Sequence, residues 1–329
     1  MAPRWQWASN SEWDQFAGDS PCATPFHSRA WCESYCAYAP RYAPRALTVE
    51  LDGRKLLVPV FVRRGLLRRG PFLRAVSSRP GVYGGPIALD GPLGESAWKS
   101  FGAALGASLL GAWECFGNVL DPHAPLASDL ACGQRSTHLV DLAALPEDVL
   151  SSYDSNCRRN VRKAEREGIT VQRESGAAAR SEYFAMYVAS QQRWGEDPER
   201  GYRERLFELL ERVAGAELWT ARTREGELAA GGWFVASRAH VVYWHGAMHE
   251  RFSPLRPANA LHHALIVESR RRGARYYDFN PSEELEGVQQ FKRSFGAREA
   301  SFATFQWRSS AAATLERWLA RARGGDRLS

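Results

Sequence analysis

The stretch RPANALHHALIVESRRRGARYYDFN at residues 256–280 decides the fold class, because it predicts a helix followed directly by a strand. Pro257 suits the first position of a helix, where its missing N–H is not needed. Gly273 suits the left-handed residue that ends one, so we expect a helix at 257–272. The aromatic run that follows is typical of a strand, at 274–280. The segment therefore predicts an α/β protein.

Regular elements flank this unit on both sides. GVQQFKRSFG at 287–296 follows as a helix or turn that Gly296 closes, and SFATFQWRS at 301–309 is a strand. Upstream, 217–223, 229–237 and 238–248 predict strands. The second half thus combines helices, a hairpin and a strand–helix–strand unit; its other helices are expected at 156–167, 178–195, 202–214 and 311–324.

The first half repeats this order. LDGRKLLVPVFV at 51–62 aligns with REGELAAGGWFV at 224–235, with Phe61 on Phe234. A hairpin around Asp52-Gly53 is expected in this segment. Hairpins of this kind are common, so the spacing alone leaves an internal duplication and a chance likeness both open. The other elements expected in this half are helices at 10–18, 28–38 and 94–111 and strands at 113–120 and 137–142.

Length and composition exclude several classes. A chain of 329 residues suits two domains, with 43 basic against 37 acidic residues and a net charge of +6. The amino terminus has no apolar core of a signal peptide, and no apolar run is long enough to cross a bilayer, so we expect a cytoplasmic protein. Six cysteines without a CxxC pair predict reduced thiols and no metal site; Cys32 and Cys36 are either a redox pair or simply buried.

Four catalytic motifs are missing: GxSxG, HExxH, GxxxxGK[ST] and GxGxxG. Their absence removes most of the support for a serine hydrolase, a zinc protease, a P-loop NTPase or a dinucleotide-binding protein. Polar residues at the ends of elements in the second half remain as candidates.

Basic residues concentrate on the helix at 156–167. Arg158, Arg162 and Arg166 repeat every four residues and share one face. They form either an anion-binding surface or a solvated face paired with Glu165 and Glu167. The segment at 61–74 interleaves arginines with Leu and Phe, and either contacts phosphate or a membrane surface or is a solvated hairpin tip.

The strand at 274–280 alternates two kinds of side chain. Tyr277 and Phe279 belong to one face, and Tyr276, Asp278 and Asn280 to the other. Aromatic strands are normally core. Asn280 ends the strand, where a polar residue more often faces a crevice.

Three groups of residues together resemble the FemAB/FemX peptidyltransferases and the CelD-like acetyltransferases of the GNAT superfamily. They are RRNVRKAEREGITV at 158–171, the run from YWHGAM to DFN at 243–280, and EGVQQFKRSFG at 286–296. PFHSRAW at 25–31 and VSSRPGVYGGP at 76–86 extend the resemblance into the first half. It implies two GNAT-like domains at 1–142 and 143–306, each a mixed, mainly antiparallel sheet flanked by helices, with a terminal helix at 307–329.

The resemblance implies transfer of an acyl or aminoacyl group to an amine. In FemX-type enzymes the Lys of an FK pair lies near the reacting ester, and here that pair is Phe291 and Lys292. Aminolysis builds negative charge on a carbonyl oxygen, which a fixed ammonium stabilises. Only four of the 43 Lys and Arg residues are lysines. A lysine at position 292 therefore fits a site that needs a compact ammonium, which the guanidinium of arginine does not replace. The alternative is a surface lysine in a turn.

The remaining site residues are expected on the strands and helices around the FK pair. Asp278 is either the general base that takes the proton of the amine or a buried partner of an arginine. The expected substrate-binding residues are Tyr243, His245, Asn280 and Arg159, and the expected carrier-binding residues are Arg158, Arg162, Arg166, Arg256 and Asn259.

We expect aminoacyl-tRNA as co-substrate and no tightly bound cofactor. RPANA at 256–260 lacks the glycines of the acetyl-CoA loop, although a helix amino terminus there could still hold a phosphate, so acyl-CoA stays as the alternative donor. Expected partners are tRNA, an amine-bearing cell-wall precursor or small molecule, and peripherally the inner membrane face, with no DNA. A catalytically inactive carrier-binding or scaffolding protein is the rival from another class.

Overall fold

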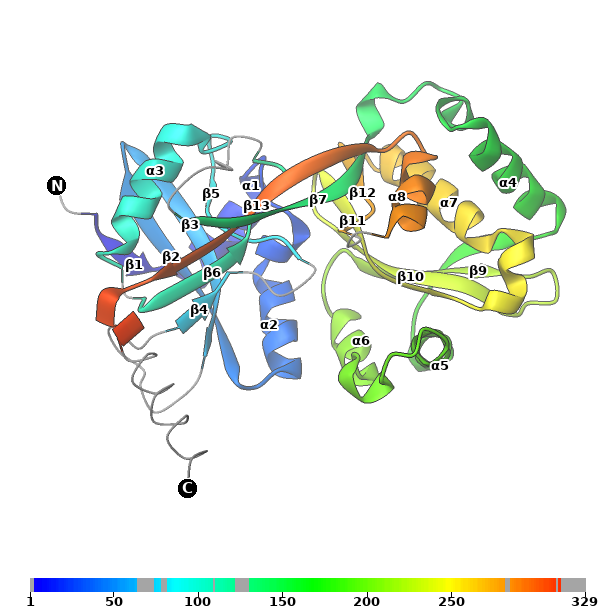
Figure 1. Cartoon of the computed structure of the whole chain (residues 1–329), viewed down its shortest axis with the longest axis horizontal. Helices are drawn as coiled ribbons and strands as arrows, with labels where there is room; N and C mark the ends of the chain where they lie inside the picture. The colour runs from blue at the N-terminus through cyan, green and yellow to red at the C-terminus, as the bar shows by residue number, and fades with distance from the viewer. Residues whose placement is uncertain are drawn as a thin grey trace, which may run out of the picture. The chain divides into compact units, whose positions relative to one another are not determined.

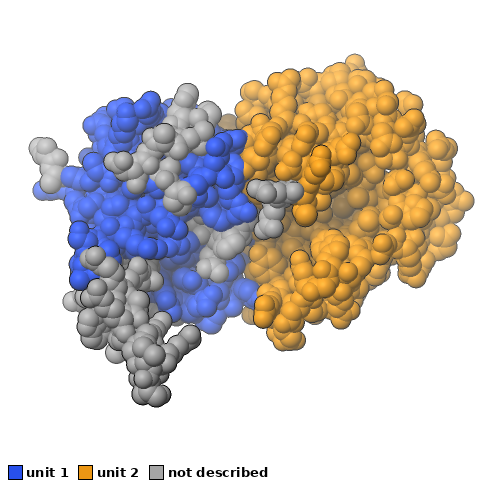
Figure 2. Space-filling model, viewed as in Figure 1, with its two compact units in different colours: residues 1–135, 301–329 blue, residues 136–300 orange. Residues whose placement is uncertain are grey.

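Two compact units make up the chain (Figure 2), residues 1–135 with 301–329 and residues 136–300. The computed structural model describes residues 3–63, 74–77, 82–108, 110–121, 130–281, 285–311 and 313–314. The predicted boundaries at 142/143 and 306/307 lie within seven residues of this division. The tip of the basic segment at 61–74, a hairpin expected at 64–69, lies outside the described residues. So does most of the terminal helix expected at 307–329, whose first two residues instead end a strand.

The first unit is a mixed sheet with the strand order β1-β2-β3-β4-β6-β13, and β5 also pairs with β3. Only β4 and β6 pair in parallel among its described strands. The strands are β1 (Trp5–Trp7), β2 (Tyr42–Leu51), β3 (Arg54–Arg63), β4 (Arg74–Val76), β5 (Ile87–Ala88), β6 (Ala112–Phe116) and β13 (Arg298–Arg308).

Helices cover both faces of this sheet. Val60 belongs to the buried cluster under α3, whereas its neighbour Phe61 contacts Tyr35 of α2, with ring centroids 5.5 Å apart. Neighbouring strand residues point to opposite faces, so α3 and α2 lie on opposite sides. Ser28 begins α2 by accepting a hydrogen bond from the Trp31 amide. The helices of this unit are α1 (Asn10–Asp19), η1 (Pro25–His27), α2 (Arg29–Tyr38) and α3 (Gly94–Leu105).

The second unit has the strand order β7-β12-β11-β10-β9-β8. Here only β11 and β12 pair in parallel among the described strands. A mixed, mainly antiparallel sheet with one parallel pair in each unit confirms the predicted fold class. The strands are β7 (Ala131–Asp141), β8 (Thr170–Glu174), β9 (Ala216–Arg222), β10 (Leu228–Ala236), β11 (His240–Met248) and β12 (Tyr276–Asp278).

Helices α4 and α7 lie on one face of the second sheet, and α5 and α6 on the other (Figure 1). Phe234 of β10 belongs to the cluster under α7, and the next residue back, Trp233, stacks on Phe207 of α6 with centroids 5.9 Å apart. The helices are α4 (Ser155–Arg166), α5 (Ala177–Arg193), α6 (Glu204–Leu210), α7 (Pro257–Arg271) and α8 (Glu286–Arg293), with the 3-10 turns η3 (Leu142–Ala144), η4 (Val149–Ser152), η5 (Pro198–Arg200) and η6 (Glu250–Leu255).

Most predicted elements occur within a few residues of their expected bounds, because their capping and turn residues behave as expected. Asp52 and Gly53 have φ of 52° and 78° between β2 and β3, the left-handed pair that a tight hairpin needs. Pro257 opens α7, and Gly273 follows it with φ of 80°. Cys32 and Cys36 are both buried, which agrees with the second of the two alternatives for this pair.

We predict that Glu174 stabilises the second unit only above acidic pH. Arg222 donates to both of its carboxylate oxygens, at 2.6 and 2.8 Å, and lowers the pKa of Glu174 to about 2. This contribution is complete above the ordinary pKa of about 4.5 and is lost as the pH falls towards 2. Glu174→Gln should therefore lower the free energy of unfolding by about 1–2 kcal/mol at pH 7 and by much less at pH 2.5.

Urea unfolding at the two pH values checks this prediction, with Glu225→Gln in the exposed turn between β9 and β10 as the control. An equal loss at both pH values would contradict the account of Glu174.

Candidate active site

Lys292 is a buried lysine in the last turn of α8. Its residue is 5% exposed, and its ammonium donates a hydrogen bond to the backbone carbonyl of Asn280. Burial lowers the pKa of Lys292 to about 8, against the opposing effect of the Asp278 charge. The side chain is therefore mostly protonated at pH 7, and the alternative of a surface lysine in a turn is wrong.

Asn280 follows β12 in a left-handed conformation, with φ of 62°. Asparagine tolerates this region better than most residues. Its backbone amide donates to Asp278 Oδ1 at 2.7 Å, and its side-chain amide donates to the Trp244 carbonyl of β11 at 3.2 Å. These bonds fix the backbone turn that presents the Asn280 carbonyl to Lys292.

The bond to Trp244 crosses the point where the parallel pair ends. β11 and β12 pair through three residues, from His240 with Tyr276 to Val242 with Asp278. Beyond it, β11 continues to Met248 while the chain after β12 turns at Asn280. Asn280, which was expected to face a crevice, thus lies just beyond the end of this short parallel pair.

Asp278 is fully buried beneath this turn. Besides the Asn280 amide, its carboxylate contacts Thr137 Oγ1 at 2.6 Å and His240 Nε2 at 3.0 Å. These bonds engage both carboxylate oxygens with a hydroxyl, an imidazole and an amide, and not with the arginine that one of the two alternatives placed there. The geometry gives Asp278 a positioning role beneath Asn280; its predicted role as a general base stays a prediction.

His262 of α7 completes the cluster, although the sequence analysis selected neither it nor its neighbour His263 as a site residue. Its Nδ1 lies 2.6 Å from the Tyr277 hydroxyl, and its ring lies 4.6 Å from that of Tyr243 and 5.5 Å from that of Phe291. Burial, and secondarily the Lys292 charge, lowers the pKa of His262 to about 3, so the imidazole is neutral at pH 7.

Phe291 packs into this buried aromatic group, with its ring 5.1 Å from that of Phe295. Phe291 thus anchors α8 beside Lys292. A catalytic role for Phe291 itself stays a prediction.

Tyr243 and His245 face opposite sides of the sheet. Phe234 of β10 pairs with Tyr243 and Trp233 pairs with His245, so Trp244 is an extra residue on β11. A bulge of this kind breaks the alternation of side chains, which would otherwise place Tyr243 and His245 together.

The contacts of the two residues agree with this separation. Tyr243 lies against His262 on the α7 side, over Gly246, where a Cβ would come 1.4 Å from the tyrosine hydroxyl oxygen. His245 Nδ1 lies 2.6 Å from the hydroxyl of Tyr183 on α5, and burial lowers the pKa of His245 to about 3. Their predicted substrate-binding roles thus concern two separate surfaces.

The basic residues of α4 lie on an unpaired surface. Arg159, Arg162 and Arg166 are exposed, whereas Arg158 is half-buried and donates to the Tyr153 carbonyl at 2.5 Å. Within the described ranges, none of the α4 basic side chains forms an ion pair, so the expected pairing with Glu165 and Glu167 does not occur.

Helix α4 is held next to the carboxyl end of α8. The Asp154 amide at its start donates to the Ser294 carbonyl at 2.9 Å, and the Tyr153 and Phe295 rings lie 5.1 Å apart. The predicted carrier surface and Lys292 therefore belong to adjoining elements of one unit.

Arg256 and Asn259 begin α7. Arg256 caps the helix with φ of 61°, and Pro257 supplies no N–H. The amides of Asn259 and Ala260 both donate to the Arg256 carbonyl, at 3.1 and 3.3 Å, and the buried Asn259 side chain points to Cys157 Sγ at 3.7 Å. This helix start therefore presents few free amides to an anion.

Two further properties of the described residues bear on the class of site. They contain no cluster of three or more His, Cys, Asp or Glu side chains placed to hold a metal ion. In the same ranges, no helix combines the length and the apolar composition needed to span a membrane.

Residues 151–293 match the model of the acetyltransferase (GNAT) domain, a range that contains α4, β8–β12 and the Lys292 cluster. No curated protein matches the chain in sequence. Residues 151–293 thus carry a GNAT acetyltransferase domain, which confirms the predicted enzyme class of an acyltransferase.

Solved structures share the fold of the whole chain. The crystal structure of FemX is similar with a TM-score of 0.69 and 15% identity, over 96% of this chain and 99% of that one. The C-terminal domain of a protein assigned as a lysylphosphatidylglycerol synthetase from Agrobacterium fabrum is similar with a TM-score of 0.52 and 13% identity, over 94% and 96%. The fold is therefore FemX-like, and the predicted resemblance is confirmed.

We predict that Asp278→Asn mainly destabilises the protein. The Asp278 carboxylate accepts from three donors, and an asparagine would place its own NH₂ group against one of them. It would also remove the negative charge that these donors stabilise. The free energy of unfolding should fall by about 2–4 kcal/mol, and by about 1 kcal/mol for Thr137→Val, which removes only one donor. Urea unfolding of both variants tests this.

Unchanged stability of Asp278→Asn, together with a turnover loss of about 10²–10⁴ and a lost acid limb of the pH–rate profile, would instead identify Asp278 as the base.

Proposed function

We propose that this acyltransferase moves an aminoacyl group from aminoacyl-tRNA to an amine, such as the peptide of a peptidoglycan precursor. The buried, protonated Lys292 held by the Asn280 carbonyl carries the proposal. A reaction of this kind breaks the ester bond to the tRNA ribose and forms an amide, and the leaving hydroxyl takes up a proton.

Lys292 suits the charge that develops in this reaction. Attack of the amine places negative charge on the ester carbonyl oxygen, and an ammonium in a water-poor site stabilises it more strongly than one in bulk water. The Asn280 carbonyl accepts one of the three ammonium hydrogens, which leaves others for the oxyanion. The same carbonyl fixes the position of the charge before the substrate binds.

The start of α7 favours tRNA over acyl-CoA as the carrier. A diphosphate bound at a helix amino terminus depends on free backbone amides. Here Pro257 has none, and the Asn259 amide, which such a helix start usually leaves free, bonds to the Arg256 carbonyl. Acyl-CoA thus remains the alternative donor, with less support from this helix.

The basic surface of α4 supports a large polyanionic carrier. Arg159, Arg162 and Arg166 are exposed without ion-pair partners among the described residues, so phosphate binding would not have to break existing pairs. The sequence resemblance to FemX-type enzymes, which implies aminoacyl-tRNA as the donor, points in the same direction. So does the similarity in fold to FemX and to a protein whose name joins lysine to phosphatidylglycerol.

A transfer assay with both donors tests the proposal directly. Purified protein is incubated with a peptidoglycan-precursor pentapeptide and either radiolabelled aminoacyl-tRNA or radiolabelled acetyl-CoA. We expect label in the peptide from aminoacyl-tRNA only. Label from acetyl-CoA alone would establish the alternative, and no label from either donor would count against this acceptor class.

Lys292→Ala should lower turnover about a hundredfold, because loss of one oxyanion-stabilising group is worth roughly 3 kcal/mol. The KM for the acceptor should change little. Lys99→Ala, which replaces an exposed lysine of the first unit, is the matched control. A Lys292→Ala enzyme with more than about half of the normal kcat would rule out the role of Lys292.

The salt dependence of tRNA binding should report the α4 surface. Each phosphate contact contributes about 0.9 to the slope of log K against log salt concentration. Arg162→Gln combined with Arg166→Gln should therefore reduce that slope by up to about 2. Arg203→Gln combined with Arg212→Gln on the α6 side removes equal charge from ion-paired positions and should leave the slope unchanged.

Filter binding between about 50 and 200 mM salt provides the measurement. The same slope for both double variants and the parent would remove α4 from the tRNA surface.

A further inference from the structure

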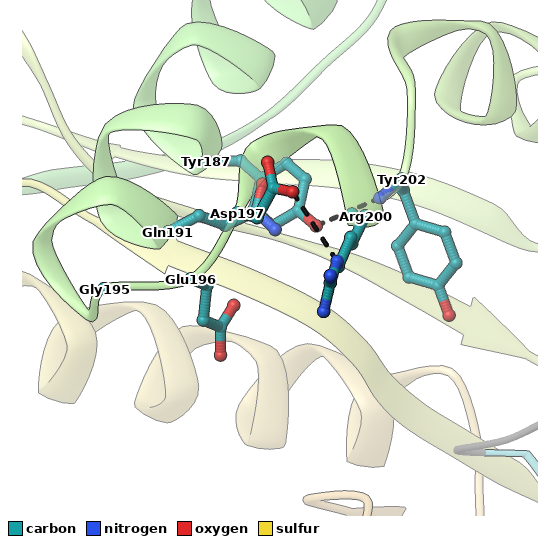
Figure 3. A pocket seen from close by; sticks show the side chains of 8 residues that line it. Tyr187, Gln191, Gly195, Glu196, Asp197, Arg200 and Tyr202 are labelled. Carbon is teal, nitrogen blue, oxygen red and sulfur yellow. Dashed lines mark hydrogen bonds and ion pairs between the residues drawn. The ribbon is translucent and has the colours of Figure 1, made fainter.

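A cavity of about 750 Å³ opens at the carboxyl end of α5, on the face of the sheet opposite α7 (Figure 3). The end of α5 and the segment that carries η5 form its walls. Its polar and aromatic lining residues are Tyr187, Gln191, Glu196, Asp197, Arg200 and Tyr202.

Gln191 brings an unused acceptor to this cavity. The residue is only 3% exposed, and its Oε1 has no hydrogen-bond partner among the described residues. A buried amide oxygen without a donor is costly, so a ligand that donates a hydrogen bond here is favoured.

Gly201 holds the segment close to this amide. A Cβ at Gly201 would lie 2.3 Å from Gln191 Nε2 and 2.6 Å from the Tyr187 hydroxyl oxygen. Any larger residue would have to displace both side chains. The amide of Tyr202 donates to the same Tyr187 hydroxyl at 3.1 Å, which ties the segment to α5.

The charged groups of the cavity leave a net negative charge. Asp197 and Arg200 lie 3.6 Å apart and compensate each other. Glu196 is exposed and has no ion-pair partner in the part of the chain that the structure describes. The lining therefore suits a ligand that is both cationic and a hydrogen-bond donor.

The cavity adjoins the strand segment that positions Lys292. The Tyr202 ring lies 5.3 Å from the Trp244 ring, and the Trp244 carbonyl accepts the side-chain amide of Asn280. The backbone carbonyl of Asn280 in turn binds the Lys292 ammonium. Contacts through Trp244 and Asn280 thus link Tyr202, at the edge of the cavity, to the Lys292 ammonium.

We propose that this cavity binds an alkylammonium group of the acceptor, separate from the amine that is acylated. The identification with the acceptor rests on the proposed function, whereas the binding of the cation rests on the cavity alone. The acceptor would then be a molecule with two amines, one held by Glu196 and Gln191 and the other presented for acylation.

Equilibrium binding of 1,5-diaminopentane tests the cation site without any donor substrate. Isothermal titration is combined with the NMR shifts of the Gly195 and Gly201 amides, and 1,5-pentanediol serves as the neutral probe of the same length. We expect binding of the diamine at least tenfold tighter than that of the diol, with shifts at both glycines.

Glu196→Gln should weaken diamine binding about tenfold and leave diol binding unchanged. Gln191→Leu should weaken it as well, whereas Glu225→Gln, at an exposed turn, should have no effect. Equal binding of diamine and diol, or an unaltered affinity of Glu196→Gln, would overturn the proposal. Because no acyl transfer is measured, a failure of the proposed function cannot produce either result.

Discussion

The contact between the Lys292 ammonium and the Asn280 carbonyl is the interaction on which the site depends. It joins the last turn of α8 to the end of β12, at the place where β11 and β12 cease to pair. A lysine this deeply buried keeps its proton only if polar groups compensate for the lost water. The carbonyl and the nearby Asp278 charge supply that compensation.

The buried network beneath the turn explains why Asn280 holds an uncommon backbone conformation. A left-handed residue that is not glycine persists when its surroundings impose it. Asp278 accepts the Asn280 amide, Thr137 and His240 hold Asp278, and Trp244 accepts the Asn280 side chain. The sheet thus fixes the Asn280 carbonyl, and this carbonyl in turn fixes the Lys292 ammonium.

Local sequence rules predicted the elements of this site, because caps, turns and alternation are local. Pro257, Gly273 and the Asp52-Gly53 turn acted as expected, and Lys292 was selected by its motif. The separation of Tyr243 from His245 was not predictable, since it depends on a bulge that only the pairing of β11 with β10 creates.

The same limit applies to contacts between distant segments. Asp278 was expected to be either a general base or the partner of an arginine, and its hydroxyl partner Thr137 lies 141 residues away in the sequence. His262 could have been favoured over His263 by its spacing from the buried Asn259 and Ile266 on one helix face. No pattern pointed to the cavity at Gln191, because its lining comes from α5 and the η5 segment, which meet only in the folded chain.

The titration of Lys292 tests the central claim most directly. The chain has only four lysines, so protein labelled with ¹³C at lysine Cε gives four signals, and Lys292→Arg identifies the one of interest. The account predicts a titration midpoint near pH 8 for that signal, with the parent fold retained. A midpoint at the ordinary lysine value of about 10.4 would contradict a buried, carbonyl-held ammonium at the centre of the site.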